Sequence, residues 1–215
     1  MNFIDICLQL IPGMLITLEI FIITLFFSTP LGLLVAIGRM SKYKILAGFF
    51  RVYIAIMRGT PLMLQLLVIY FGPYYLFGIS IDSSYRGVAV MIAFSLNYAA
   101  YFAEIYRGGI ESVDKGQWEA AYILGYSKRL TFFKIIFPQV IRQILPAMTN
   151  ETVTLVKDTS LAFSIAYAEM FTEAKRIAAA QTSMLPFVAA GVFYFVFNAL
   201  IAFLSNRVRD KLDYY

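Results

Sequence analysis

Long apolar stretches constrain what this chain can fold into more than any other feature of its sequence. Each stretch runs for about 20 residues or more, the length that an α-helix needs to cross a bilayer core about 30 Å thick. Backbone groups inside lipid must be hydrogen-bonded within the segment, so each stretch is expected to be helical. The five stretches span residues 12–37, 46–71, 87–106, 136–167 and 185–204. The sequence therefore predicts an all-α, polytopic integral membrane protein made of one transmembrane domain, residues 1–215.

The overall composition supports a membrane protein. Hydrophobic residues make up 60% of the 215 residues and charged residues only 14%, whereas soluble domains carry about 25% charged residues. A soluble domain of this length could not bury so much apolar surface. The first stretch begins at Pro12 and lacks a basic leader and a small-residue cleavage site, so we expect it to be a retained span and not a signal peptide.

The composition also excludes several classes of function. The sequence has no histidine, and Cys7 is its single cysteine. Histidine-dependent triads, zinc hydrolase motifs, cysteine metal clusters and an internal disulfide are thereby excluded, and we expect no catalytic or metal site. The net charge of +5 comes from residues beside the apolar stretches. We therefore expect no nucleic-acid binding.

The distribution of lysine and arginine predicts the orientation in the membrane. Basic residues concentrate after the first, third and fifth stretches, whereas the segment before the first has none and the other two loops have few or balanced charges. Because basic loops stay in the cytoplasm, the N-terminus is expected outside and the C-terminus inside. The basic residues of the three cytoplasmic segments are Arg39, Lys42, Lys44, Arg51, Arg107, Lys115, Lys128, Arg129, Lys134, Arg142, Arg207, Arg209 and Lys211.

The longest cytoplasmic loop, residues 107–135, contains a predicted short helix. Its sequence is D-K-G-Q-W-E-A-A-Y-I-L-G-Y from Asp114 to Tyr126. Asp114 and Gln117 have capping-box spacing, and Gly125 is placed as a C-cap. A helix of about 15 Å is marginal alone in water, so it needs a surface to pack against. Lipid headgroups and a partner protein are both compatible with these residues.

A resemblance to a known family favours the partner protein. The sequence E-A-A-Y-I-L-G, followed by F-P-Q-V-I-R-Q-I-L-P, resembles the EAA loop shared by permease subunits of binding-protein-dependent ABC importers. Three further segments are similar to the histidine, glutamine and arginine permease family. They are M-R-G-T-P-L-M-L-Q-L from Met57, A-Y-F-A-E-I-Y-R-G-G-I-E-S-V from Ala100, and K-D-T-S-L from Lys157. The resemblance covers nearly the whole chain and implies the type I ABC importer permease fold with five transmembrane helices.

The resemblance also implies a set of partners. Glu119, Ala120, Ala121 and Gly125 fall on the family's coupling helix, which seats in a groove of the ATPase subunit. The chain has no G-x-x-x-x-G-K-[ST] phosphate loop, so ATP and Mg²⁺ are expected on a separate cytoplasmic ATPase dimer, with no cofactor in this chain. A second permease subunit, favoured as an identical copy, and an external amino-acid-binding protein complete the expected importer, in a prokaryotic cell membrane.

Polar side chains inside the fourth stretch are candidates for substrate binding. Glu151 and Asp158 are seven residues apart, so on a helix they share one face and lie about 10.5 Å apart along the axis. Asn150 lies beside them. The carboxylates could bind the cationic side chain of arginine, lysine or protonated histidine. Alternatively, Lys157 neutralises one carboxylate and the rest only pack helices together.

Other polar residues are candidates for the backbone end of an amino acid. They are Arg58, Thr60 and Gln65 in the second stretch and Asn97 in the third. Gly59 and Pro61 flank Thr60 and predict a broken helix at a central cavity, a recurrent transporter device. The alternative is a simple kink, with Arg58 reaching the membrane interface.

The leading hypothesis is therefore a transport subunit, not an enzyme, for polar and preferably basic amino acids. A glutamine or glutamate permease is the main alternative. An ion-coupled secondary transporter, with a proton on Glu151 or Asp158, is a second alternative. A membrane enzyme with a Ser160 and Lys157 dyad has weaker support. Glu104 and Arg107 are expected to form a local ion pair without a substrate role.

Overall fold

The computed structural model describes residues 2–212, and this part of the chain is helical without any strand. The prediction of an all-α protein is confirmed. The elements are α1 (Phe3–Arg39), α2 (Lys44–Gly59), α3 (Leu62–Phe77), α4 (Tyr85–Glu111), α5 (Lys115–Ile123), α6 (Lys128–Thr131), the π-helical turn η1 (Phe132–Ile136), α7 (Phe137–Asp158), the 3-10 segment η2 (Thr159–Ile165), α8 (Met170–Gln181) and α9 (Leu185–Leu212).

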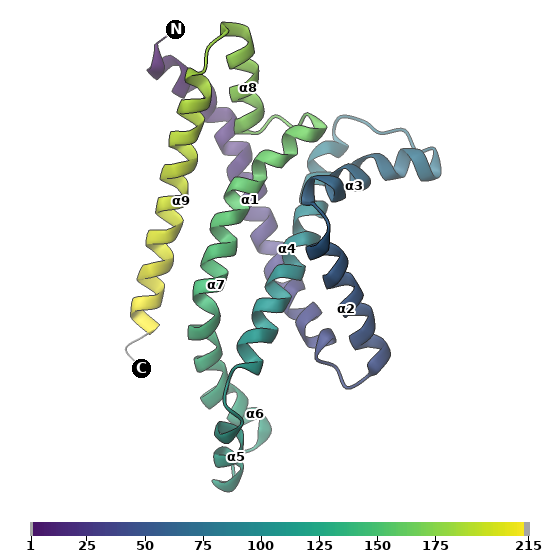
Figure 1. Cartoon of the computed structure of the whole chain (residues 1–215), viewed down its shortest axis with the longest axis vertical. Helices are drawn as coiled ribbons and strands as arrows, with labels where there is room; N and C mark the ends of the chain where they lie inside the picture. Colours follow the sequence, from purple (N-terminus) through teal and green to yellow (C-terminus); the bar gives the residue numbers. More distant parts are fainter. Residues whose placement is uncertain (1, 213–215) are drawn as a thin grey trace.

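The long helices α1, α4, α7 and α9 follow the long axis of the molecule (Figure 1). The N-terminus and α8 lie at one end of this axis, whereas α5 and α6 lie at the other, beyond the C-terminal end of α9. Helix α3 turns away from α2 and points outward from the bundle. The two ends of the molecule therefore carry different segments, as expected for a protein with one face on each side of a membrane.

Three of the described helices, α1, α4 and α9, are long and apolar enough to cross a membrane. The second predicted span, residues 46–71, is not one straight helix, because α2 and α3 meet at an angle of 107°. Counting this bent pair as one span gives four. The break falls at Thr60, whose backbone is extended, and at Pro61, which has no N–H to continue a helix.

The fourth predicted span, residues 136–167, also differs from a single helix. It comprises the last residue of η1, then α7, then η2, and the chain turns into a left-handed conformation at Ala166 (φ 55°). α7 is not among the helices that qualify as candidate spans. The polar residues of α7, which include Glu151 and Asp158, make this helix too hydrophilic to qualify.

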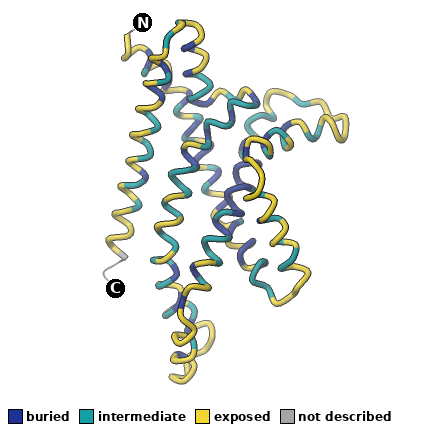
Figure 2. The backbone as a smooth tube through the Cα atoms, in the orientation of Figure 1, coloured by how far each residue is buried: buried dark blue, intermediate teal, exposed yellow. Residues whose placement is uncertain are grey.

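The core lies where α4 packs against α1. Figure 2 shows the buried residues concentrated along these two helices. Phe94, Tyr98 and Phe102 of α4 are fully buried. At Gly32 of α1, an added Cβ would lie 2.9 Å from the Cβ of Phe102. Small residues thus allow the two helices to approach closely, as in many membrane bundles.

Candidate functional site

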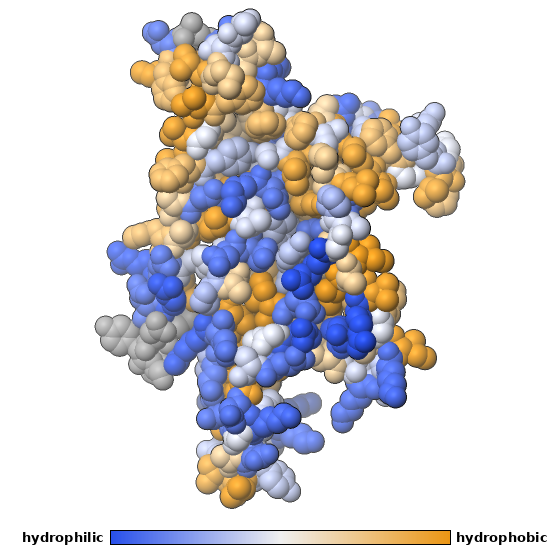
Figure 3. Space-filling view, viewed as in Figure 1, coloured by the Kyte–Doolittle hydropathy of each residue, from blue (hydrophilic) through white to orange (hydrophobic). Residues whose placement is uncertain are grey.

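A polar cavity of about 340 Å³ lies between the α2–α3 break, α4, α7 and η2. Hydrophilic side chains gather over the middle of the face shown in Figure 3, whereas apolar ones dominate the end that carries α8. Four of the substrate-site residues predicted from the sequence line this one cavity: Thr60, Asn97, Glu151 and Asp158. The remaining lining residues are Pro61, Leu62, Tyr98, Tyr101, Thr154 and Leu161.

The two carboxylates form one acidic wall of the cavity. Glu151 and Asp158 both line it from α7, with Thr154 between them. The hydroxyl of Tyr98 donates a 2.7 Å hydrogen bond to Oδ2 of Asp158. Among residues 2–212, the ion pairs shorter than 4.0 Å include neither carboxylate and do not include Lys157, which is exposed. Lys157 therefore does not neutralise the acidic wall by direct pairing.

Gln65 and Asn97 hold the broken helix in place. The side-chain nitrogen of Gln65 donates to the carbonyl of Met57 (2.9 Å) and to Oγ1 of Thr60 (2.8 Å). Asn97 donates to the same carbonyl (2.9 Å) and to Oε1 of Gln65 (3.0 Å). These bonds satisfy carbonyl groups that lose their helical partners at the break. Gln65 lies behind the cavity and does not line it, unlike Asn97.

Arg58 is likewise outside the cavity lining. One of its guanidinium nitrogens lies 3.8 Å from Oε2 of Glu104, and its guanidinium carbon lies 5.2 Å from the ring centroid of Tyr101. Arg107 binds the Glu104 carboxylate with both a 2.7 Å and a 3.1 Å hydrogen bond. The predicted Glu104–Arg107 pair is therefore present, and Arg58 joins it from α2.

Asn150 lies in a different pocket from its neighbour Glu151. That pocket, of about 110 Å³, sits between α7 and α9 and is lined by Asn150, Thr149, Ser205, Asn206 and Arg209, with Leu145 and Pro146. Successive residues of an α-helix point about 100° apart, which separates Asn150 from the acidic wall. The structure therefore does not bring Asn150 together with the other predicted residues.

The predicted short helix of the long loop is present as α5. Oδ1 of Asp114 caps its first turn by accepting a 2.6 Å bond from the N–H of Gly116. At the other end, the N–H groups of Gly125 and Tyr126 donate to the carbonyls of Tyr122 and Ala121, both at 3.0 Å. This is a Schellman motif, and it needs the left-handed backbone that Gly125 adopts (φ 78°).

Helix α5 exposes apolar side chains at the end of the molecule. Tyr122, Ile123 and Leu124 are 81%, 83% and 74% exposed. Glu119 and Ala120 are also exposed, whereas Ala121 is buried. Apolar side chains that are adjacent and exposed mark a contact surface. The spacing of Trp118 and Tyr122 at i, i+4 places those two on one helix face, but Ile123 and Leu124 were not predicted, although an apolar run directly after the E-A-A motif is visible in the sequence.

Sequence reasoning also missed several residues of the cavity. Tyr98 and Tyr101 lie within about one turn of Asn97 on α4, so they face the same region. Leu161 belongs to η2, whose 3-10 geometry no sequence pattern indicated. The two tyrosines could have been predicted from the sequence, because they lie within about one helical turn of Asn97, which was already a candidate.

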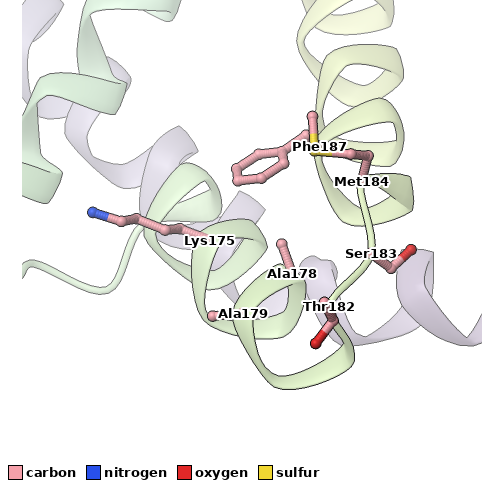
Figure 4. Close-up of a pocket in the computed structure, with 7 residues that line it drawn as sticks. All are labelled: Lys175, Ala178, Ala179, Thr182, Ser183, Met184 and Phe187. Carbon is pink, nitrogen blue, oxygen red and sulfur yellow. The ribbon is translucent and has the colours of Figure 1, made fainter.

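A further pocket of about 460 Å³ lies between α8 and α9, near the N-terminal end (Figure 4). In Figure 4 Lys175 extends away from Phe187, and its ammonium lies 5.3 Å from the ring centroid of Phe163. The other lining residues are Ala178, Ala179, Thr182, Ser183 and Met184. This pocket lacks the paired carboxylates that distinguish the cavity beside α7.

Apolar helices around a charged cavity, with an exposed helix beyond one end, define a membrane transport component. Residues 28–214 match the family described as the inner membrane component of binding-protein-dependent transport systems. The chain belongs to this family. The predicted role as an ABC permease subunit, with ATP hydrolysis carried by a separate subunit, is confirmed.

The individual relatives are all named as transport system permeases, but their names give different substrates. The chain is 37% identical over 205 residues to the L-cystine transport system permease protein TcyB of Bacillus subtilis (strain 168), covering 94% of this chain and 86% of that protein. It is 36% identical to the putative glutamine transport system permease protein GlnP of Rickettsia bellii (strain RML369-C), covering 95% and 93%.

A solved structure supports the fold. The crystal structure of an amino acid ABC transporter with histidines contains a chain that superposes with a TM-score of 0.88 at 31% identity, covering 98% of this chain and 99% of that one. The type I ABC permease fold predicted from the sequence is thereby confirmed.

Proposed function

We propose that this chain is the permease subunit of an ABC importer for basic amino acids, namely arginine, lysine and protonated histidine. The observation that carries the proposal is the pair of carboxylates, Glu151 and Asp158, in one cavity without an ion-pair partner among the described residues. A guanidinium or ammonium group would form charge-assisted hydrogen bonds with them. A charge retained at membrane depth usually faces a cavity or a partner in this way.

The other wall of the cavity suits the backbone end of an amino acid. Helix α3 begins at Leu62, which lines the cavity together with Thr60. The first N–H groups of a helix lack intrahelical acceptors and carry partial positive charge, so they favour a carboxylate. Transporters with broken helices bind anionic substrate groups in this manner. The amino acid would then lie between α3 and α7, with its side chain toward the carboxylates.

The relatives do not select a substrate for this chain. Their names refer to cystine and to glutamine, and the solved structure refers to histidines. The alternative proposal is therefore a glutamine or glutamate permease. The acidic wall favours a cationic amino acid over glutamine and glutamate.

The proposed topology has five spans, with the N-terminus outside and the C-terminus in the cytoplasm. α7 is the fourth span in this topology, because its residues Glu151, Thr154 and Asp158 line the cavity and so need not face lipid. The end of the molecule that carries α5 and α6 (Figure 1) is also the end with the basic loop residues Lys128, Arg129 and Lys134. That end is therefore cytoplasmic in our proposal.

The proposed partners follow from the exposed surfaces and the family. Glu119, Ala120, Ala121 and Gly125, together with the apolar side chains that follow Ala121, would seat α5 in a groove of one ATPase subunit, which also carries ATP and Mg²⁺. A second copy of this chain would complete the permease dimer. An external binding protein would deliver the amino acid from the opposite end.

The test is uptake into proteoliposomes that contain this chain, its ATPase and its binding protein, supplied with arginine, lysine, histidine, glutamine, glutamate or cystine. We expect ATP-dependent uptake of the three basic amino acids and little uptake of the others. A preference for glutamine would contradict the basic-substrate proposal. Uptake that persists without nucleotide and stops when the proton gradient collapses would instead identify a secondary transporter.

A further inference from the structure

Arg58 lies beside the acidic cavity without lining it. It occupies the last turn of α2, directly before the helix break at Thr60. Its guanidinium stacks over Tyr101, whose side chain forms part of the cavity wall. A cation is thus built into the protein next to the place where a cationic substrate would bind.

Glu104 fixes the position of that cation. Its carboxylate lies 3.8 Å from Arg58 but forms the closer, two-bond contact with Arg107 at 2.7 and 3.1 Å. Arg107 in turn pairs with Glu111, one turn further along α4. Arg107 thus makes the closer interaction with Glu104, and Arg58 is the cation of this cluster that contacts the cavity wall, through Tyr101. Glu104 therefore anchors Arg58 beside the cavity through the longer of its two ion pairs.

We propose that Arg58 is a tethered counter-charge that sets how strongly the cavity holds a cation, with Glu104 as its positioning residue. This inference rests on the proposed function and assigns Arg58 a role other than binding the substrate carboxylate. The acidic wall alone would hold an arginine or lysine tightly and release it slowly. The positive charge behind Tyr101 weakens that hold, so that the substrate can leave during each transport cycle.

The test is equilibrium binding of radiolabelled arginine and glutamine to the permease–ATPase complex in nanodiscs, without the binding protein. The measured quantity is the ratio of the glutamine Kd to the arginine Kd. Arg58→Gln should raise this ratio about tenfold, the order of magnitude of a unit-charge interaction at an effective dielectric constant of about 20. Arg58→Lys keeps the charge and should leave the ratio within about twofold of the wild type.

Glu104→Gln should change the ratio in the opposite direction, because it removes a negative charge and frees Arg58 to approach Glu151. A general loss of structure cannot produce opposite shifts in the two variants. Arg51→Gln is the matched control, since Arg51 is an exposed arginine two turns earlier on α2. It should leave the ratio unchanged, and an equal shift in this control would overturn the proposal.

The remaining outcomes separate this inference from the proposed function. A wild-type complex that does not prefer arginine to glutamine contradicts the proposed function, whatever the variants do. If the wild type prefers arginine but Arg58→Gln weakens both amino acids equally, Arg58 binds the common backbone carboxylate or supports the fold, and the tethered counter-charge is wrong. A tenfold rise confined to the ratio, with a reversed shift in Glu104→Gln, supports it.

Discussion

The hydroxyl of Tyr98 and the carboxylate of Asp158 join α4 to the last residue of α7 through a 2.7 Å hydrogen bond. Tyr98 is almost fully buried, and Asp158 lies where α7 changes into the 3-10 segment η2. The bond therefore fixes the orientation of the Asp158 carboxylate at the point where the α-helix ends. Substrate binding should depend on it.

Tyr98→Phe should weaken arginine binding by about tenfold. The ring keeps its packing, but Asp158 loses a donor, and a hydrogen bond to a charged group contributes about 1.5–3 kcal/mol. Equilibrium binding to the permease–ATPase complex measures the change. Tyr53→Phe is the control, because its hydroxyl donates a 2.6 Å bond to the carbonyl of Leu96, away from the cavity lining. Equal losses in the two variants would mean that Tyr98 does not position Asp158 for binding.

Ile123→Ser should lower substrate-stimulated ATP hydrolysis by at least tenfold while leaving the permease fold intact. Ile123 is 83% exposed on α5, so its contribution in the isolated chain is small, but an apolar anchor at the centre of an interface contributes about 2 kcal/mol or more. The measurement is ATPase activity of the reconstituted complex together with the thermal stability of the purified permease. Leu130→Ser, in α6 of the same loop and 41% exposed, is the control. Normal stimulation in Ile123→Ser would exclude this side chain from the ATPase contact.

Gly13→Ala should destabilise the purified permease by about 1–3 kcal/mol, because overpacking a tight contact has this cost. An added Cβ at Gly13 would lie 2.8 Å from the Cα of Met170, a backbone atom that cannot rotate away. The matched variant is Gly191→Ala in α9, where no atom lies within 4 Å of the added Cβ. Since alanine is the better helix former, Gly191→Ala should be neutral or slightly stabilising. Thermal unfolding in detergent compares them, and equal stability would contradict the close α1–α8 packing.

Local patterns predicted the features that depend on local physics. Apolar length predicted α1, α4 and α9, and the missing N–H of Pro61 predicted the helix break. Residue spacing placed Glu151 and Asp158 on one face of α7, and both line the same cavity. Capping residues predicted α5, and Gly125 adopts the left-handed conformation expected of it.

The remaining features depend on contacts between distant parts of the chain. Arg58 meets Glu104 only because α2 packs against α4, and no pattern within either helix indicates this pairing. The sequence indicated a break at Pro61 but not the 107° angle between α2 and α3. Asn150 and Glu151 line different pockets, because neighbouring residues of a helix point about 100° apart.

The most direct test of the central claim is arginine uptake by the reconstituted importer with Glu151→Gln and Asp158→Asn, compared with wild type and with Glu119→Gln as a carboxylate control outside the cavity. If the acidic wall recognises a cation, both cavity variants should lose at least tenfold in arginine binding to the permease–ATPase complex and in uptake, because each leaves a substrate charge without its partner. Glu119→Gln should bind arginine as the wild type does, even where coupling to the ATPase is weakened. Unchanged arginine binding and uptake in both cavity variants would contradict the account and leave the two carboxylates with a structural role.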